Sequence, residues 1–199
     1  MATTSLTDGR SARAARTRDA VVEALLGLLD DGNLRPTARE IADRAGVSLR
    51  SVYVHFDDLE DLFTAAAGKQ FKRMATLYAP LASDGPLATR IEALVNQRSR
   101  MMEAAGPVRR ATMLQEPFSP TLAKVMGLVR KAMRDEIERV FAAELGHVPG
   151  EDRDRLLAAV DVAAGTATWE TLRTHDGFDV DAAREVVVEM LTKLLGEPV

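Results

Sequence analysis

The sequence predicts an all-α protein in which a small N-terminal domain precedes a larger helical domain. Two observations carry this prediction. Apolar residues recur at helical spacing, as in Val21, Leu25 and Leu28. Alternating β-branched runs and Asn-Gly or Asp-Gly hairpins between apolar segments are missing, so strands are not expected. About nine helices follow from these patterns, over residues 14–30, 38–45, 49–55, 58–79, 86–105, 107–115, 119–145, 151–174 and 179–195.

The composition of the chain excludes several kinds of site. Its 199 residues are 46% hydrophobic and 28% charged, which is typical of a globular protein with a sizeable core. The absence of cysteine excludes disulfides, thiolate zinc sites, iron–sulfur clusters and cysteine nucleophiles. No run approaches the roughly 18 apolar residues that a membrane span needs, and no apolar leader stretch is recognisable. We therefore expect a cytoplasmic protein without cofactors or metals.

The formal net charge of −4 argues at first against nucleic-acid binding, which requires positive potential. The charge is unevenly distributed, however. Residues 10–56 contain eight arginines and six carboxylates, a balance of +2, whereas residues 57–199 contain 18 basic and 23 acidic residues, a balance of −5. Asp8 contributes the remaining −1. A mildly basic N-terminal segment thus precedes an acidic remainder.

The first three expected helices have clear start and stop signals. The first helix ends near Gly32, a residue that favours helix termination. Thr37 precedes the second helix and Glu40 follows three residues later, which is the pattern of a capping box. After Gly46, the hydroxyl of Ser48 is placed to cap the short third helix.

The spacing between these helices matches the steric needs of a helix-turn-helix. Such a motif requires a small residue within its first helix, a turn residue that tolerates positive φ, and an apolar anchor in the following helix. Ala42, Gly46 and Val52 meet these three needs. We interpret the segment as a DNA-binding helix-turn-helix. The alternative is that the pattern arises by chance in an alanine-rich helical chain.

The flanking residues strengthen the interpretation. The stretch from Thr37 to Phe63 contains four short sequence motifs: Ile41-Ala42, Gly46-Val47-Ser48, Tyr53-x-His55-Phe56 and Glu60-x-Leu62. It resembles the N-terminal domain of the tetracycline-repressor (TetR) family of transcriptional regulators. The resemblance covers about residues 14–65 by motif, and the rest of the chain only by length and helical content.

The resemblance implies a domain organisation and a set of partners. We expect a three-helix DNA-binding domain at 14–56 and a ligand-binding and dimerisation domain at 57–199 whose first helix, 58–79, connects the two. The arginines near the start indicate a flexible basic tail at 1–13, and the alternative is a basic arm that reaches the DNA backbone or minor groove. The implied partners are a double-stranded DNA operator, a small-molecule effector and a second copy of the chain.

The candidate DNA-binding residues come from the second and third helices. Exposed positions of the third helix face a major groove, where Arg50 can reach guanine while Leu49 and Val54 can touch a thymine methyl. By resemblance, Arg39 is a second base reader. Hydroxyl and imidazole groups suit phosphate oxygens, and the complete candidate set is Thr37, Arg39, Ser48, Leu49, Arg50, Ser51, Tyr53, Val54 and His55. Alternatively, Tyr53 belongs partly to the core and His55 only ends its helix.

The start of the fourth helix departs from the family. Members often carry a lysine there beside a phosphate, whereas this chain has Leu59, preceded by Asp57 and Asp58. Aspartates complement the positive end of a helix dipole, so they make good caps. They also remove positive charge from a phosphate site, so we expect only modest non-specific DNA affinity.

A ligand pocket and a dimer interface are expected in the second domain. Flexible methionines and a lone tryptophan suit a pocket for a bulky hydrophobic ligand, although most such residues serve as core. The candidate lining is Met102, Met113, Phe118, Met126 and Trp169. Small residues at 163–167 allow close helix approach, and two apolar stripes on 179–195 widen that helix's apolar face. We therefore expect a homodimer through helices 151–174 and 179–195.

Catalysis is not expected. None of the three histidines has a metal-binding spacing, and no nucleophile elbow, P-loop or dinucleotide fingerprint is present. The sequence thus favours a ligand-responsive transcriptional regulator, a repressor that binds a near-palindromic operator as a dimer and is released by a small hydrophobic molecule. The alternative is a helical protein-interaction module whose helix-turn-helix does not bind DNA, an idea supported by Asp57 and Asp58.

Overall fold

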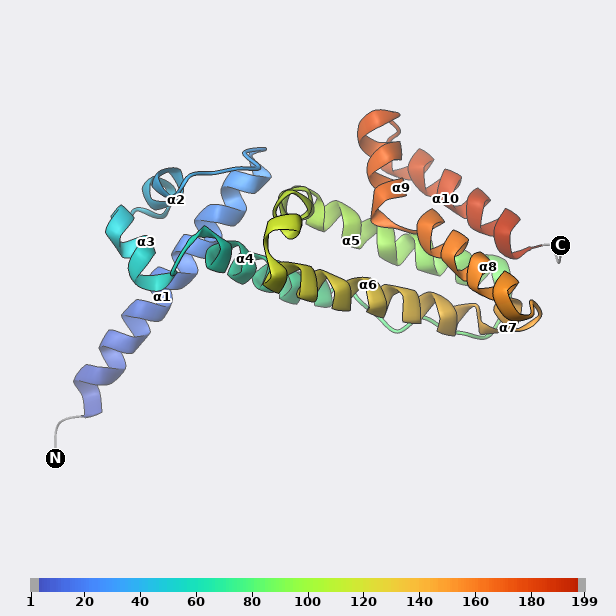
Figure 1. Ribbon diagram of the computed structural model, residues 1–199, viewed down its shortest axis with the longest axis horizontal. Coiled ribbons are helices and arrows are strands. Elements are labelled where there is room, and N and C mark those ends of the chain that lie inside the picture. Colours follow the sequence, from blue (N-terminus) through green and yellow to red (C-terminus); the bar gives the residue numbers. More distant parts are fainter. Residues whose placement is uncertain (1–3, 197–199) are drawn as a thin grey trace. The chain divides into compact units, whose positions relative to one another are not determined.

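The all-α prediction is confirmed by the computed structural model, which describes residues 4–196 and contains no strand within that range. Figure 1 shows the helices in chain order. They are α1 (Thr4–Asp30), α2 (Ala38–Ala45), α3 (Leu49–His55), α4 (Leu59–Ala75), α5 (Leu87–Gln115), α6 (Pro120–Val140), α7 (Ala142–Gly146), α8 (Gly150–Ala163), α9 (Thr166–Glu170) and α10 (Val180–Leu195), with a 3₁₀ turn at Glu116–Phe118 and a π-helical turn at Thr171–His175. Across the described range, no helix is both long and apolar enough to cross a membrane.

The N-terminal helix is longer than expected. α1 begins at Thr4, so residues 4–13, which we expected to form a flexible tail, continue the helix, while residues 1–3 lie outside the described range. The segment contains no proline to interrupt a helix, and its one alanine and two arginines favour helix. The next expected helices, 38–45 and 49–55, are confirmed to the residue.

Two expected helices are a single helix in the structure. We predicted a break between 105 and 107, but α5 runs from Leu87 to Gln115 with Pro107 inside it. Proline removes one backbone hydrogen bond and disfavours the helix locally, but it does not stop a helix whose flanking residues favour it.

Two other expected helices are divided. The predicted helix 119–145 breaks at Phe141, and 151–174 breaks at Ala164 and Gly165. Side chains bind the carbonyl groups that the second break leaves open: Thr168 Oγ1 donates to the Val162 carbonyl at 2.6 Å, and Arg98 Nη1 donates to that of Ala164 at 3.3 Å. A Cβ at Gly165 would lie 2.8 Å from the Asp161 carbonyl oxygen, so glycine is needed at this sharp bend.

The chain folds into two compact units. The first comprises the chain up to Arg73 together with Ala105–Val125, and the second comprises Met74–Ala104 together with the chain from Met126 onward. α5 and α6 therefore each contribute residues to both units. These units divide the chain at positions other than the expected boundary between 56 and 57. The functional domain ranges 14–56 and 57–199 stay a prediction.

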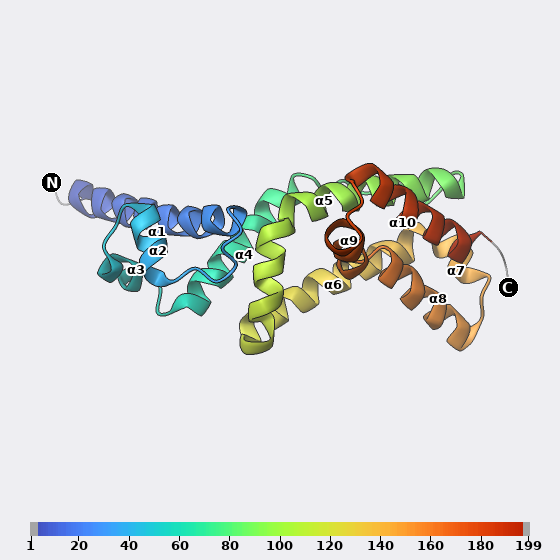
Figure 2. The same cartoon turned by 90° about the horizontal axis from the view of Figure 1, so that it is seen from above.

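The first unit has its own apolar core. In it α1, α2 and α3 pack against one another, as both views of the fold show (Figures 1 and 2). Its fully buried side chains come from every helix of this unit up to α5, and include Val21, Leu25, Leu29, Ile41, Val52, Phe56, Leu62 and Ala111. The apolar faces predicted for the first three helices are therefore the faces that are buried.

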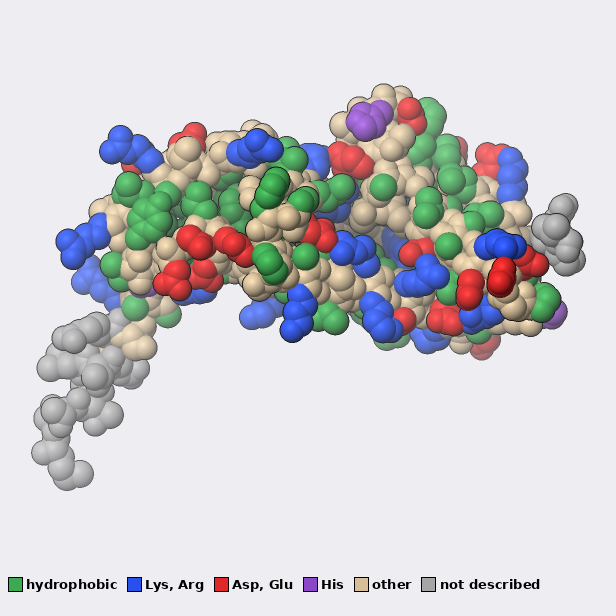
Figure 3. Space-filling model, viewed as in Figure 1, with side chains coloured by type: hydrophobic (Ala, Val, Ile, Leu, Met, Phe, Trp, Pro, Cys, Tyr) green, Lys and Arg blue, Asp and Glu red, His purple; other side chains and the backbone are tan. Residues whose placement is uncertain are grey.

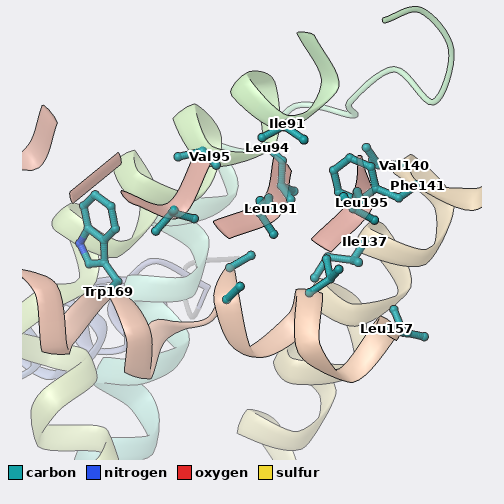
Figure 4. Packing of buried hydrophobic residues seen from close by; sticks show 14 of the residues in the cluster. Ile91, Leu94, Val95, Ile137, Val140, Phe141, Leu157, Trp169, Leu191 and Leu195 are labelled. Carbon is teal, nitrogen blue, oxygen red and sulfur yellow. The ribbon is translucent and has the colours of Figure 1, made fainter. Parts of the chain in front are cut away.

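The second unit is built around a separate core. Residues from α5, α6, α8 and α10 meet there, with Leu94, Ile137, Phe141, Val160 and Leu191 all fully buried. In Figure 4, Trp169 lies at one end of this cluster, and Phe141 and Leu195 lie at the other.

We expect Gly46→Ala to destabilise the protein by about 1 kcal/mol, because Gly46 has φ of 66° and an L side chain is strained there. The added methyl group would meet nothing within 4 Å, so the cost is conformational. Gly68→Ala is the matched control: it lies within α4, has equal space, and should instead stabilise by up to about 1 kcal/mol. Urea unfolding followed by circular dichroism measures both. Equal effects of the two substitutions would contradict this account of Gly46.

Candidate nucleic-acid interface and ligand cavity

The helix-turn-helix is assembled by local capping. Thr37 and Glu40 form the predicted capping box: the Glu40 N–H donates to Thr37 Oγ1 at 3.3 Å, and the Thr37 N–H donates to the Glu40 carboxylate at 2.7 Å. These hydrogen bonds lower the pKa of Glu40, with the backbone N–H of Thr37 contributing most. Gly46 adopts the left-handed conformation, and Ser48 Oγ accepts the N–H of Ser51 at 3.1 Å to begin α3.

The three spacing residues have the expected roles. Ala42 is buried where α2 meets its neighbours, Val52 is buried as the anchor of α3, and Gly46 supplies the positive φ of the turn. The helix-turn-helix is thus present in the fold as well as in the sequence pattern.

One face of α3 is open to solvent. Leu49, Arg50, Tyr53 and Val54 are exposed, and the exposed fraction of Val54 reaches 71%. These four positions share one side of the helix because they are spaced one, three and one residue apart. Exposed apolar side chains beside an arginine suit the edges of base pairs in a major groove.

The other candidate DNA contacts surround this face. Arg39 and Ser48 are exposed, whereas Ser51 and His55 are partly buried. Thr37 is exposed, but its hydroxyl donates to the Glu40 carboxylate at 2.7 Å. That hydrogen would have to change partner before it could reach a phosphate.

The start of α4 is acidic on its exposed side. Asp58 Oδ1 accepts the N–H of Asp61 at 2.8 Å, which is the capping role expected for this aspartate. Leu59 is partly buried against the first core, while Asp57, Asp58, Glu60 and Asp61 are exposed. Figure 3 shows acidic side chains gathered over this region.

Ion pairs between α1 and α4 were not predicted from the sequence. Lys69 Nζ and Arg73 Nη2 each lie 2.5 Å from Glu23 Oε1, and Lys69 also pairs with Asp19. The hydrogen bond from Lys69 is the largest of several that lower the pKa of Glu23. The partners lie about fifty residues apart in the sequence, so no local pattern could have revealed them.

The predicted ligand-binding residues do not form one site. Met102 and Trp169 are buried in the second unit and line the same small cavity, and Met126 is partly buried. Met113 and Phe118 belong to the first unit and are exposed, Phe118 by 79%. Of the five predicted residues, Met102 and Trp169 line the same cavity, and the ligand-binding role of the set stays a prediction.

Phe118 instead lines an open pocket of about 470 Å³ in the first unit. Pro36, Leu59, Phe63 and Leu122 supply most of its apolar wall. Ser119 donates to Glu60 Oε1 at 2.6 Å at this pocket, which ties the start of α6 to the start of α4.

The cavity beside Trp169 is small and mostly apolar. Its volume is about 10 Å³, enough for one water-sized group. The lining residues are Val95, Arg98, Met102, Ala163, Ala164, Gly165, Trp169 and Val187. Arg98 is the charged member of this lining. Its burial had no clear sequence signal, because Arg98 stands in a polar run, Asn96 to Arg100, of a helix that carries several other arginines.

Glu103 holds the indole and the π-helical turn in place. It accepts the N–H of Trp169 at 2.8 Å and two hydrogen bonds from Arg173, from Nε at 3.0 Å and from Nη2 at 3.1 Å. These contacts lower the pKa of Glu103, with the hydrogen bond from Arg173 contributing most.

The geometry defines a class of protein: a helix-turn-helix domain with an exposed third helix, followed by an all-helical unit with its own core. Residues 22–66 match the sequence profile of the bacterial regulatory proteins of the tetR family. These findings confirm the resemblance to the TetR family: the chain carries the family's helix-turn-helix domain and, as the solved structures below show, the fold of its members.

Solved structures share this fold over most of their length. A tetR-family transcriptional regulator from Streptomyces coelicolor has a TM-score of 0.69 and 19% identity over 90% of this chain and 79% of its own. A transcriptional regulator from Rhodococcus sp. RHA1 has a TM-score of 0.68 and 16% identity over 92% and 96%. The multidrug binding protein EbrR, complexed with imidazole, has a TM-score of 0.59 and 21% identity over 92% and 96%. A comparison with curated proteins finds no match.

Acid should weaken the contacts of Glu103. Because its folded-state pKa lies below the ordinary value of 4.5, its contribution to stability is complete above that value and is lost as the pH falls through the lower folded-state pKa. We expect Glu103→Gln to reduce stability at pH 7 and to flatten its decline below about pH 4.5. Urea unfolding at pH 7 and pH 3.5, followed by Trp169 fluorescence, measures this. Glu92→Gln, an exposed site on the same helix, is the control, and an unchanged acid dependence in Glu103→Gln would contradict the prediction.

Proposed function

We propose that this protein is a transcriptional regulator that reads DNA sequence through α3 and responds to a small-molecule effector. The observation that carries the proposal is the exposed face of Leu49, Arg50, Tyr53 and Val54 on the third helix of a helix-turn-helix. Arg50 would donate to the O6 and N7 atoms of guanine, while Leu49 and Val54 would contact thymine methyl groups.

Contacts to the phosphate backbone would position the domain. Tyr53, Ser48 and Ser51 can donate to phosphate oxygens, and Arg39 stands at the start of α2. The balance of +2 in residues 10–56 is modest, and the acidic start of α4 opposes phosphate binding nearby. Specific contacts would therefore provide a larger share of the affinity than charge alone.

Protection of genomic DNA fragments from nuclease tests this proposal. We expect a near-palindromic protected site and a steep dependence of affinity on salt. Arg50→Ala should weaken binding to that site by about 1–3 kcal/mol and relax the preference for one base. Tyr53→Phe should weaken binding to all sequences to a similar extent. Arg100→Ala removes the same charge from an exposed position of α5 and should change neither property.

The competing function is a protein-interaction module that does not bind DNA. The exposed carboxylates at the start of α4 favour it, because they repel phosphate. A failure to protect any site at low salt, across broad sampling of fragments, would support this module and overturn the regulator.

A homodimer through α8 and α10 fits the packing of these helices. Two apolar stripes run along α10. Val187, Leu191 and Leu195 are buried in the core of their own unit, whereas Val186, Met190 and Leu194 are only partly buried. On α8, Val162 is 68% exposed. The second stripe and Val162 could pair with their copies about a two-fold axis and place two helix-turn-helix domains on one operator.

We expect Met190→Glu to convert the dimer to a monomer, because it would bury a carboxylate in the proposed interface. Thr192→Glu places the same charge at an exposed position of α10 and should leave the dimer intact. Sedimentation at micromolar concentration distinguishes the two variants. A monomeric unmodified protein would overturn the proposed interface.

An effector would act by changing the separation of the two DNA-binding domains. The ion pairs of Glu23 with Lys69 and Arg73 join α1 to α4, so a tilt of α4 would move α1 with it. An effector that binds more tightly to one separation would shift the protein toward it. We propose release of the operator by a largely hydrophobic molecule, and the multidrug binding of the structural relative EbrR is consistent with such a ligand.

A further inference from the structure

Arg98 is a buried cation in the second core, and its environment is unusual. Only 3% of its side-chain surface is exposed, and it lines the cavity beside Trp169. Burial of a charge is costly unless the charge is paired and fully hydrogen-bonded. The hydrogen bonds of the guanidinium therefore show whether the site is complete.

The guanidinium is incompletely bonded. Nη2 donates to the Met133 carbonyl at 2.6 Å, and Nη1 donates to the Ala164 carbonyl at 3.3 Å, so both of these acceptors are uncharged. Nε is buried and has no hydrogen-bond acceptor among the described residues. A strong donor of a buried cation is thus left without an acceptor, on a residue that lines the cavity.

The carboxylate nearest to Arg98 is engaged elsewhere. Glu136 Oε2 lies 3.8 Å from Nη2, which is too far for a hydrogen bond. Its other oxygen accepts Gln97 Nε2 at 3.1 Å, and Tyr78 is also hydrogen-bonded to this carboxylate. Desolvation lowers the pKa of Arg98 despite the nearby charge of Glu136.

The rest of the cavity lining is suited to hydrocarbon. Val95, Met102, Val187 and the Trp169 ring face the same space as Arg98. The volume of that space is about 10 Å³, which is room for one water molecule. An alkyl chain would therefore have to displace side chains, and Met102, with three rotatable bonds, is the most adaptable member of the lining.

We propose that the effector is an aliphatic carboxylic acid whose carboxylate accepts a hydrogen bond from Nε of Arg98 while its chain packs against Met102, Val95 and Trp169. The proposal rests on the effector-responsive function above and specifies the chemistry of that effector. The charge-assisted hydrogen bond would complete the bonding of the guanidinium, and a neutral ligand of the same shape would lack the charge.

Octanoate and octanamide form a matched pair of probes for the full-length protein. They have the same chain and a carbonyl oxygen, but only octanoate is charged. Trp169, the sole tryptophan, lines the cavity and reports binding by its fluorescence. We expect octanoate to bind at least about tenfold more tightly than octanamide. Equal affinities, or no binding of octanoate, would overturn the proposal.

A double variant tests the role of Arg98 itself. Arg98→Gln alone would leave Glu136 buried without its cation and would endanger folding. Combining Arg98→Gln with Glu136→Gln keeps the site neutral, and we expect the preference for octanoate to disappear. Arg100→Gln, at an exposed position two residues away, should keep the preference. An undiminished preference in the double variant would assign the carboxylate to another site and overturn the proposal.

Nuclease protection without any probe separates this proposal from the proposed function. A protein that protects a DNA site but does not distinguish octanoate from octanamide contradicts only the assignment of the effector. A protein that prefers octanoate but protects no DNA contradicts the regulator while supporting the carboxylate site.

Discussion

The left-handed turn at Gly46 is the constraint on which the DNA-reading surface depends. It ends α2 and lets Ser48 begin α3 two residues later. With so short a turn, the burial of Val52 determines which face of α3 remains outside. Arg50, Tyr53 and Val54 are exposed for that reason. The proposed base contacts therefore follow from one backbone conformation and from one anchor, Val52, which packs in the core of the first unit.

The second unit depends instead on buried polar side chains of α5. Arg90 Nη1 donates to the Val140 carbonyl at 2.7 Å and to Glu144 Oε2 at 2.9 Å, on either side of the break between α6 and α7. Arg98 donates to the Ala164 carbonyl at the break between α8 and α9. Each arginine thus stabilises a place where a helix ends inside the protein. Of these two arginines, Arg98 also has a buried Nε without an acceptor and lines a cavity, and the proposed carboxylate site rests on this difference.

Local signals were sufficient for the helix-turn-helix and insufficient for the rest of the chain. Thr37, Glu40, Gly46 and Ser48 act through hydrogen bonds within a few residues, so their spacing predicted the helix boundaries correctly. A helix break was expected between 105 and 107, yet α5 continues through Pro107, because tertiary context can outweigh local propensity. The exposure of two predicted pocket residues was not foreseen for a related reason. Methionine and phenylalanine occur in protein cores, in ligand pockets and on surfaces. The residue types of Met113 and Phe118 therefore could not reveal that both side chains are exposed.

The sequence by itself determined the fold class, the helix-turn-helix and the candidate face of α3. Helical periodicity and capping depend on residues within a few helical turns of one another, so they can be recognised in the sequence. Tertiary structure alone decided the rest. It divided α5 between two units and joined Glu23 to Lys69 across about fifty residues. It also buried Arg98 beside Trp169. These outcomes depend on which helices pack together, and side-chain burial is a property of that packing.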